Sequence, residues 1–203
     1  MVDLNEFYKN VHVVCVREVP LGKRVFTLLE EVIQLLPDEP QFKAPGQSAF
    51  MIGNIHEATA FWEKIGPKWG HAPTLVRRNK HGEVVALRDG NCQTAFLENN
   101  SHLGVRYIIT IVIDNLDERT DGYIKGLIAH ELSEMSYGFR SGQENFDELN
   151  KMKPKARGMM INKLTKSTDD ADSEEYQKHE DEVNDEARRL GFGKEIDELE
   201  SAG

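Results

Sequence analysis

The spacing of apolar residues predicts several helices, because side chains three and four positions apart lie on one face of a helix. Each segment with this spacing is bounded by a residue that favours a helix end. The segments are Arg24–Leu36, ended by Pro37; Ala58–Ile65, ended by Gly66 and Pro67; about Gly122 to Gly138, with Asp121 as its N-cap; and about Ser173 to Leu190, with Gly191 as its stop. Between the last two, Ser141–Asp172 contains Pro154, Gly158 and many charges and is expected to be irregular.

Runs of β-branched and aromatic residues predict strands in the first half and the middle of the chain. The strongest candidate is Val105–Ile113, and the weaker candidates are Val11–Val16 and Thr94–Leu97. Thr74–Arg78 and Glu83–Leu87 flank the turn sequence Asn-Lys-His-Gly, which predicts a hairpin. A strand that leads into a helix, with another helix behind it, predicts an α+β fold with a small mixed sheet.

The helix expected from Gly122 to Gly138 contains His130-Glu131-Leu-Ser-Glu134, a sequence of the form H-E-x-x-E. It differs by one residue from H-E-x-x-H, in which two histidines one turn apart bind zinc. Because positions i and i+4 share a helix face, His130 and Glu134 could both bind one ion. Glu131 would point about 100° away and lie close enough to act on water beside that ion.

On a helical wheel this motif shares the apolar side of its helix. The apolar side is defined by Tyr123, Ile124, Leu127, Ile128 and Met135, and the opposite side by Lys125, Ala129, Ser133 and Ser136. His130, Glu131 and Glu134 fall within the apolar arc or at its rim. Ionisable groups on a buried face cost several kcal/mol unless they are paired or bound to a metal. The wheel therefore favours a metal site over a solvent-exposed helix edge.

The last predicted helix is expected to supply a third ligand, because a catalytic zinc needs about three protein ligands and an open position. One stripe of this helix, with spacings of four and three residues, consists of Tyr176, Glu180, Val183, Ala187 and Leu190. Glu180 is the only charged member of the stripe, which favours it as the ligand. His179 is the alternative and would give a site with two histidines and one carboxylate.

These residues together resemble the gluzincin type of zincin metallopeptidases. The matching pattern is His130-Glu131-x-x-Glu134 followed by Glu180-x-x-x-Asn184-x-x-Ala187-x-x-Leu190-Gly191. In that family H-E-x-x-H precedes a glutamate ligand on a later helix, often with an Asp four residues after it. The resemblance covers about Val105 to Leu190 and is closer to the compact, single-domain members. It implies a zincin-like fold whose C-terminal helix supplies the third ligand.

Carried over residue by residue, the resemblance makes His130 and Glu180 metal ligands and Glu131 the general base. Asn184 takes the position of the supporting Asp, and Glu134 that of the second histidine ligand. Two carboxylate ligands would make the metal less electrophilic than two imidazoles would. Zinc is the expected metal, with manganese or iron possible.

The activity implied by the resemblance is hydrolysis of peptide bonds in a peptide or protein substrate. Glu131 would take a proton from water and deliver it to the leaving amine. Tyr137, Tyr176 and His179 are the candidates for an oxyanion partner. The strand Val105–Ile113 would be the sheet-edge strand that borders the cleft and pairs with the substrate. The alternative is a zincin-derived protein that binds a metal or a partner and hydrolyses nothing.

Charge and composition narrow the classes of partner and compartment. The net charge of -10 argues against a general nucleic-acid binder, and no apolar run approaches the roughly 20 residues that span a membrane. Cys15 and Cys92 form no C-x-x-C pair, and the N-terminus carries no secretory signal, so a reducing cytoplasm is expected. The oligomeric state is left open.

The domain organisation predicted from composition is a single zincin-like domain over residues 1–203. No flexible linker divides the chain, although residues 1–70 are a possible N-terminal extension. Residues 105–190 would form the core of the metal site, and residues 191–203 are expected to be an acidic tail.

Overall fold

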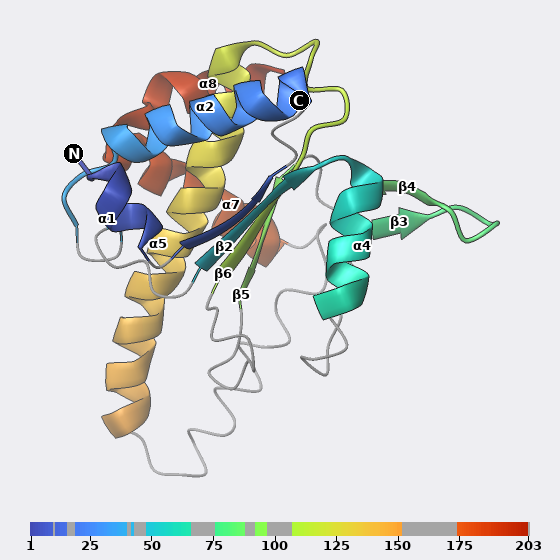
Figure 1. Ribbon diagram of the computed structural model, residues 1–203. Coiled ribbons are helices and arrows are strands. Elements are labelled where there is room, and N and C mark those ends of the chain that lie inside the picture. Colours follow the sequence, from blue (N-terminus) through green and yellow to red (C-terminus); the bar gives the residue numbers. More distant parts are fainter. Residues whose placement is uncertain are drawn as a thin grey trace.

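A mixed four-stranded sheet lies at the centre of the fold (Figure 1). The computed structural model describes residues 1–9, 11–15, 19–39, 42, 48–65, 76–87, 92–96, 107–151 and 174–202. The strand order in the sheet is β1 (Val11–Cys15), β2 (Ser48–Gly53), β6 (Tyr107–Val112) and β5 (Cys92–Phe96). The first three strands are parallel, and β5 is antiparallel to β6. The predicted hairpin forms a separate sheet of β3 (Val76–Arg78) and β4 (Val84–Leu87).

Helices cover both faces of the main sheet (Figure 1). On one side lie α2 (Pro20–Leu35) and α5 (Asp121–Lys151), and α4 (Ile55–Ile65) lies on the other. The remaining helices are α1 (Leu4–Tyr8), α7 (Glu174–Ala187) and α8 (Gly193–Ser201). Helix α5 packs against α2 and β5, and also against α7 and α8. The prediction of a mixed α and β fold is confirmed, and the motif helix packs between the sheet and the C-terminal helices.

The central strand β2 was not predicted from the sequence. Phe50 and Ile52 join the main core, while the alternating residues Ala49 and Met51 are also buried. Strands that are covered on both faces show no alternation of apolar and polar residues. The segment Ser48–Gly53 therefore lacks the pattern that marks a half-exposed strand.

The strongest predicted strand, Val105–Ile113, is not the edge of the sheet. The strand found within this range, β6, pairs with β2 on one side and with β5 on the other. The expectation of a sheet-edge strand here is therefore wrong, and β5 occupies the edge next to the motif helix. The chain forms the edge strand β5 before the interior strand β6, and strand propensity does not reveal this order.

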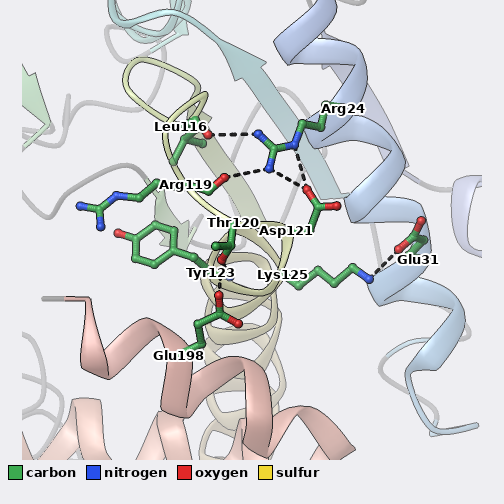
Figure 2. Close-up of polar contacts among 9 residues, drawn as sticks. All are labelled: Arg24, Glu31, Leu116, Arg119, Thr120, Asp121, Tyr123, Lys125 and Glu198. Atoms are coloured by element: carbon green, nitrogen blue, oxygen red, sulfur yellow. Dashed lines mark hydrogen bonds and ion pairs between the residues drawn. The ribbon is translucent and has the colours of Figure 1, made fainter.

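The N-terminal end of α5 is held by polar contacts to α2 and α8 (Figure 2). Arg24 donates to Asp121 Oδ1 from Nε at 2.8 Å and to the carbonyl oxygen of Arg119 from a terminal nitrogen at 2.8 Å. Thr120 Oγ1 accepts from the backbone N–H of Tyr123, and its hydroxyl donates to Glu198. Thr120 is thus the N-cap in place of the predicted Asp121, which is the first helical residue and pairs with Arg24.

Helix α5 extends well beyond the predicted end at Gly138. It continues to Lys151, so the expectation that the chain becomes irregular at Ser141 is wrong for residues 141–151. The rest of the segment expected to be irregular, residues 152–172, lies outside the described residues. No helix in the described ranges is long and apolar enough to cross a membrane.

The chain turns sharply after α7 and forms another helix. Gly191 has φ 104°, a conformation that side chains with a Cβ rarely adopt, within the short segment η2 (Arg188–Phe192). Gly191 interrupts the helix as predicted, but residues 193–201 then form α8 and bury Ile196 against the core. The prediction that residues 191–203 are an acidic tail is therefore corrected. The described part of residues 1–70 likewise supplies β1, α2 and β2, so it is no peripheral extension.

Close contact between α5 and α8 depends on Gly126. A Cβ at this position would lie 2.4 Å from the carbonyl oxygen of Glu195 and 3.1 Å from Leu199 Cβ. We expect Gly126→Ala to lower the free energy of unfolding by about 1–3 kcal/mol, because overpacking outweighs the higher helix propensity of alanine. Gly193→Ala is the matched control, since its Cβ would meet only Arg188 Cγ at 3.8 Å. Urea unfolding checks this prediction, and equal stability of the two variants would contradict it.

Candidate metal centre

The structure brings predicted site residues together in two pairs between α5 and α7. His130 Nε2 lies 3.3 Å from Glu180 Oε2, and His179 Nε2 lies 3.9 Å from Glu134 Oε1. His130 and Glu134 come from α5, and His179 and Glu180 come from α7. Both candidates for the third ligand thus reach the motif, but each faces a different motif residue.

The apolar stripe of α7 explains why Glu180 lies next to His130. Val183, Ala187 and Leu190 are buried, as the stripe predicted, and Val183 and Ala187 have no exposed surface. Glu180 precedes Val183 by three residues, and its side chain is 29% exposed. The carboxylate therefore lies at the rim of the helix interface, where an ion from solvent could reach it.

Asn184 holds the other ring nitrogen of His130. The Nδ1 atom of His130 lies 2.9 Å from Asn184 Oδ1, and Asn184 Nδ2 donates to Glu200 Oε1 at 3.1 Å. Because the amide oxygen accepts only, Nδ1 carries the proton and donates to it. In the neutral ring, Nε2 then carries a lone pair. This hydrogen bond places Asn184 where the resemblance expects a supporting side chain.

In the neutral ring, a lone pair on His130 Nε2 therefore faces a carboxylate oxygen of Glu180, whereas a doubly protonated ring forms an ion pair with it. Two acceptors repel unless a proton or a cation lies between them. Zinc bonds of 2.0–2.2 Å to nitrogen and oxygen place two ligands of a tetrahedral site about 3.4 Å apart. The observed separation of 3.3 Å matches this spacing. The pair therefore fits two of the ligands of a metal site.

A complete ligand set is not assembled among the described residues. Within these ranges no group of three or more His, Cys, Asp or Glu side chains is arranged to hold one ion. Glu134, the expected partner of His130 on the same helix, lies nearest to His179. Glu134 would have to turn from His179 toward His130 to become a third ligand.

His179 lies in a cluster of its own with Tyr137. The two rings pack edge to face with centroids 5.4 Å apart, and the Tyr137 hydroxyl donates to Glu182 at 2.5 Å. The Glu134 carboxylate beside the ring raises the pKa of His179 above 6.5, burial opposes that rise, and the charges of Glu180 and Glu182 add to it. The hydroxyl of Tyr137, one oxyanion candidate, is thus hydrogen-bonded to Glu182. The side chain of Tyr176, another oxyanion candidate, lies outside the described residues.

Glu131, the expected general base, is buried beside the edge strand. Its exposed fraction is 5%. Burial raises the pKa of the Cys92 thiol on β5 well above its usual value, and the charge of Glu131 raises it further. Glu131 therefore lies on the β5 side of α5, whereas His130 faces α7.

The side of α5 opposite the motif is buried too. Ala129, Ser133 and Ser136 have no exposed surface, because α7 and α8 cover this side of the helix. Ser136 Oγ donates to Glu186 at 2.9 Å, and Arg189 donates to the same carboxylate at 2.8 Å. This buried group was missed by sequence reasoning, although Glu186 and Arg189 stand at the i, i+3 spacing of a helical ion pair.

The sequence matches no protein-family model, and comparisons with curated proteins and with solved structures find no similar protein. The arrangement of the described residues is therefore what supports a function for this chain.

Replacement of Glu134 tests the second pair in metal-free protein. We expect Glu134→Gln to lower the pKa of His179 toward 6.5, because it removes the negative charge that raises it. In the parent, this pair stabilises the fold fully below about pH 6.5, and the contribution is lost as pH rises through the raised pKa. The variant should lose that part of the pH dependence. NMR titration of the His179 ring and melting temperatures against pH measure both effects, and an unmoved pKa would contradict the pairing.

Proposed function

We propose that this protein is a metal-dependent hydrolase of peptide bonds with a zincin-like site. The observation that carries the proposal is the His130 and Glu180 pair, in which the Nε2 atom of the imidazole lies 3.3 Å from a carboxylate oxygen. In the neutral ring, donation from His130 Nδ1 to Asn184 Oδ1 leaves the lone pair of Nε2 directed to Glu180, so the pair is suited to a cation.

His130 and Glu180 would hold the metal, with Glu134 as the third ligand and His179 as the alternative. The ion would act as a Lewis acid toward the scissile carbonyl. Zinc is our first choice because an imidazole and carboxylates are ordinary zinc ligands, and manganese or iron suit a carboxylate-rich set.

Glu131 would serve as the general base. It follows His130 directly and lies near Cys92 of β5, so a substrate bound along the edge of β5 would bring its carbonyl group toward this carboxylate. Glu131 would accept a proton from the attacking water and return it to the leaving amine. Its burial excludes bulk water, which strengthens electrostatic interactions with a reacting group.

The edge strand β5 supports a peptide as the substrate class. Among the described strands β5 pairs only with β6. An extended peptide could therefore add to its other side through backbone hydrogen bonds, the mode of recognition that open sheet edges provide.

A second candidate is a zincin-derived protein that binds a metal or a partner without hydrolysis. The 5% exposure of Glu131 favours it, because a base this buried reaches water only if the cleft opens. The place of Glu134 beside His179 favours it as well, since the ligand set is then incomplete.

The first test is the metal content of the full-length protein, measured by elemental mass spectrometry after incubation with zinc, manganese or iron. We expect near-stoichiometric metal in the parent and its loss in His130→Ala and Glu180→Gln. The matched control is Asp181→Asn, an exposed carboxylate next to Glu180 on α7. A parent that takes up none of these metals would contradict the hydrolase and the metal-binding form of the second candidate, and would leave only its partner-binding form.

The second test separates hydrolysis from binding alone. We expect Glu131→Gln to keep its metal and to lose at least about 100-fold in kcat/KM against a library of unstructured peptides, which is the usual contribution of a general base. Cleavage by the parent and loss in this variant would support the hydrolase. A metal-loaded parent that cleaves no peptide would instead support the binding protein.

A further inference from the structure

Helix α8 contacts the candidate metal centre through a chain of side chains. Glu200 Oε1 on α8 accepts from Asn184 Nδ2 at 3.1 Å, and Asn184 Oδ1 lies 2.9 Å from His130 Nδ1. The chain runs from a carboxylate through an amide to an imidazole. The Glu200 carboxylate accepts from the Asn184 amide nitrogen, and the Asn184 amide oxygen accepts from the His130 ring.

An amide has two ends of nearly equal shape and opposite hydrogen-bonding character. Asn184 could turn over and present Nδ2 to His130 without any change in packing. A carboxylate accepts only, so Glu200 favours the orientation that directs Nδ2 to α8 and Oδ1 to the ring. Glu200 therefore favours one of the two orientations of the Asn184 amide, although both fill the same space.

The two amide orientations select different tautomers of His130. With Oδ1 at the ring, Nδ1 carries the proton and Nε2 offers a lone pair beside Glu180. With the amide turned over, Nδ1 would accept from Nδ2, and the proton would move to Nε2. The ring would then donate from Nε2 to Glu180, and it would have no lone pair there for an ion.

Glu200 is itself held in place by Arg188. Its other carboxylate oxygen, Oε2, accepts from Arg188 at 2.8 Å, and Arg188 also donates to Asp197 Oδ1 at 3.2 Å. This leaves Oε1 of Glu200 for Asn184. An Asp in the position of Asn184 would need no such partner, because both of its oxygens accept.

We propose that Glu200 positions His130 for metal binding by setting the orientation of the Asn184 amide. The effect on metal affinity rests on the proposed metal centre, whereas the effect on the tautomer does not. Helix α8 is then part of the site, and Asn184 with Glu200 performs the task that a single Asp would perform.

The direct test is the tautomer of His130 in full-length, metal-free protein at alkaline pH. Long-range ¹H–¹⁵N NMR correlations distinguish a proton on Nδ1 from one on Nε2, and a His130→Gln spectrum assigns the signals. We expect Nδ1–H in the parent and a shift toward Nε2–H in Glu200→Ala. Asn184→Asp in the Glu200→Ala background should restore Nδ1–H, because its carboxylate cannot donate. Asp197→Asn, which removes another partner of Arg188 on α8, should leave the tautomer unchanged.

A zinc titration of the same proteins measures the consequence for binding. We expect Glu200→Ala to weaken zinc binding by about two- to tenfold, the usual effect of one hydrogen bond, and Asn184→Ala by about 10- to 100-fold. The Glu200→Ala/Asn184→Asp double variant should regain the parent affinity, and Asp197→Asn should keep it.

The two proposals fail in different ways. An unchanged tautomer in Glu200→Ala, or a doubly protonated ring in the parent, would overturn the role of Glu200 whether or not zinc binds. A parent that binds no zinc but shows the expected tautomer change would overturn the metal centre and leave Glu200 as the residue that orients His130.

Discussion

The burial of the first half of α5 on nearly all of its sides is the constraint on which the rest of the structure depends. Between Ile124 and Ser136 most of its side chains have little or no exposed surface. A buried polar group costs free energy unless it is hydrogen-bonded, so each one on this helix requires a partner. The Ser133 hydroxyl donates to the backbone carbonyl oxygen of Ala129 at 2.7 Å, and the Ser136 hydroxyl donates to the Glu186 carboxylate.

Polar contacts therefore determine how α7 lies along α5, in addition to apolar packing. His130 meets Asn184, Ser136 meets Glu186, and Tyr137 meets Glu182, so α7 could not slide by one turn without breaking all three. Glu186 is buried and receives hydrogen bonds from Arg189 as well, and loss of its partners would leave a buried charge at a cost of several kcal/mol. The exposed ion pairs elsewhere on the surface contribute much less.

The candidate site follows from this same arrangement. A histidine at the rim of a buried helix is oriented by an amide, and its free nitrogen faces a carboxylate from the neighbouring helix. Glu131 points to another side of α5, toward the edge strand, because successive residues of a helix are about 100° apart. The expected ligands and the expected base thus lie on different sides of the same helix, His130 toward α7 and Glu131 toward β5.

The sequence by itself determined the features that depend on local helical geometry. His130 and Glu134 lie one turn apart, Val183, Ala187 and Leu190 share a buried face, and Asn184 lies one turn after Glu180, because each follows from 3.6 residues per turn. The break at Gly191 is equally local, since only glycine adopts its backbone conformation without strain.

Only the tertiary structure decided which elements meet. The interior place of β6, the edge place of β5 and the pairing of His179 with Glu134 all depend on segments far apart in the sequence. The burial of Ser133 and Ser136 required α7 and α8 to cover a side of α5 that its own pattern marked as polar. Glu200 stood in a segment expected to be a tail, and it meets Asn184 only because the chain turns back at Gly191. A helical wheel shows which residues share a face of one helix, whereas the elements that cover each face depend on how the whole chain packs.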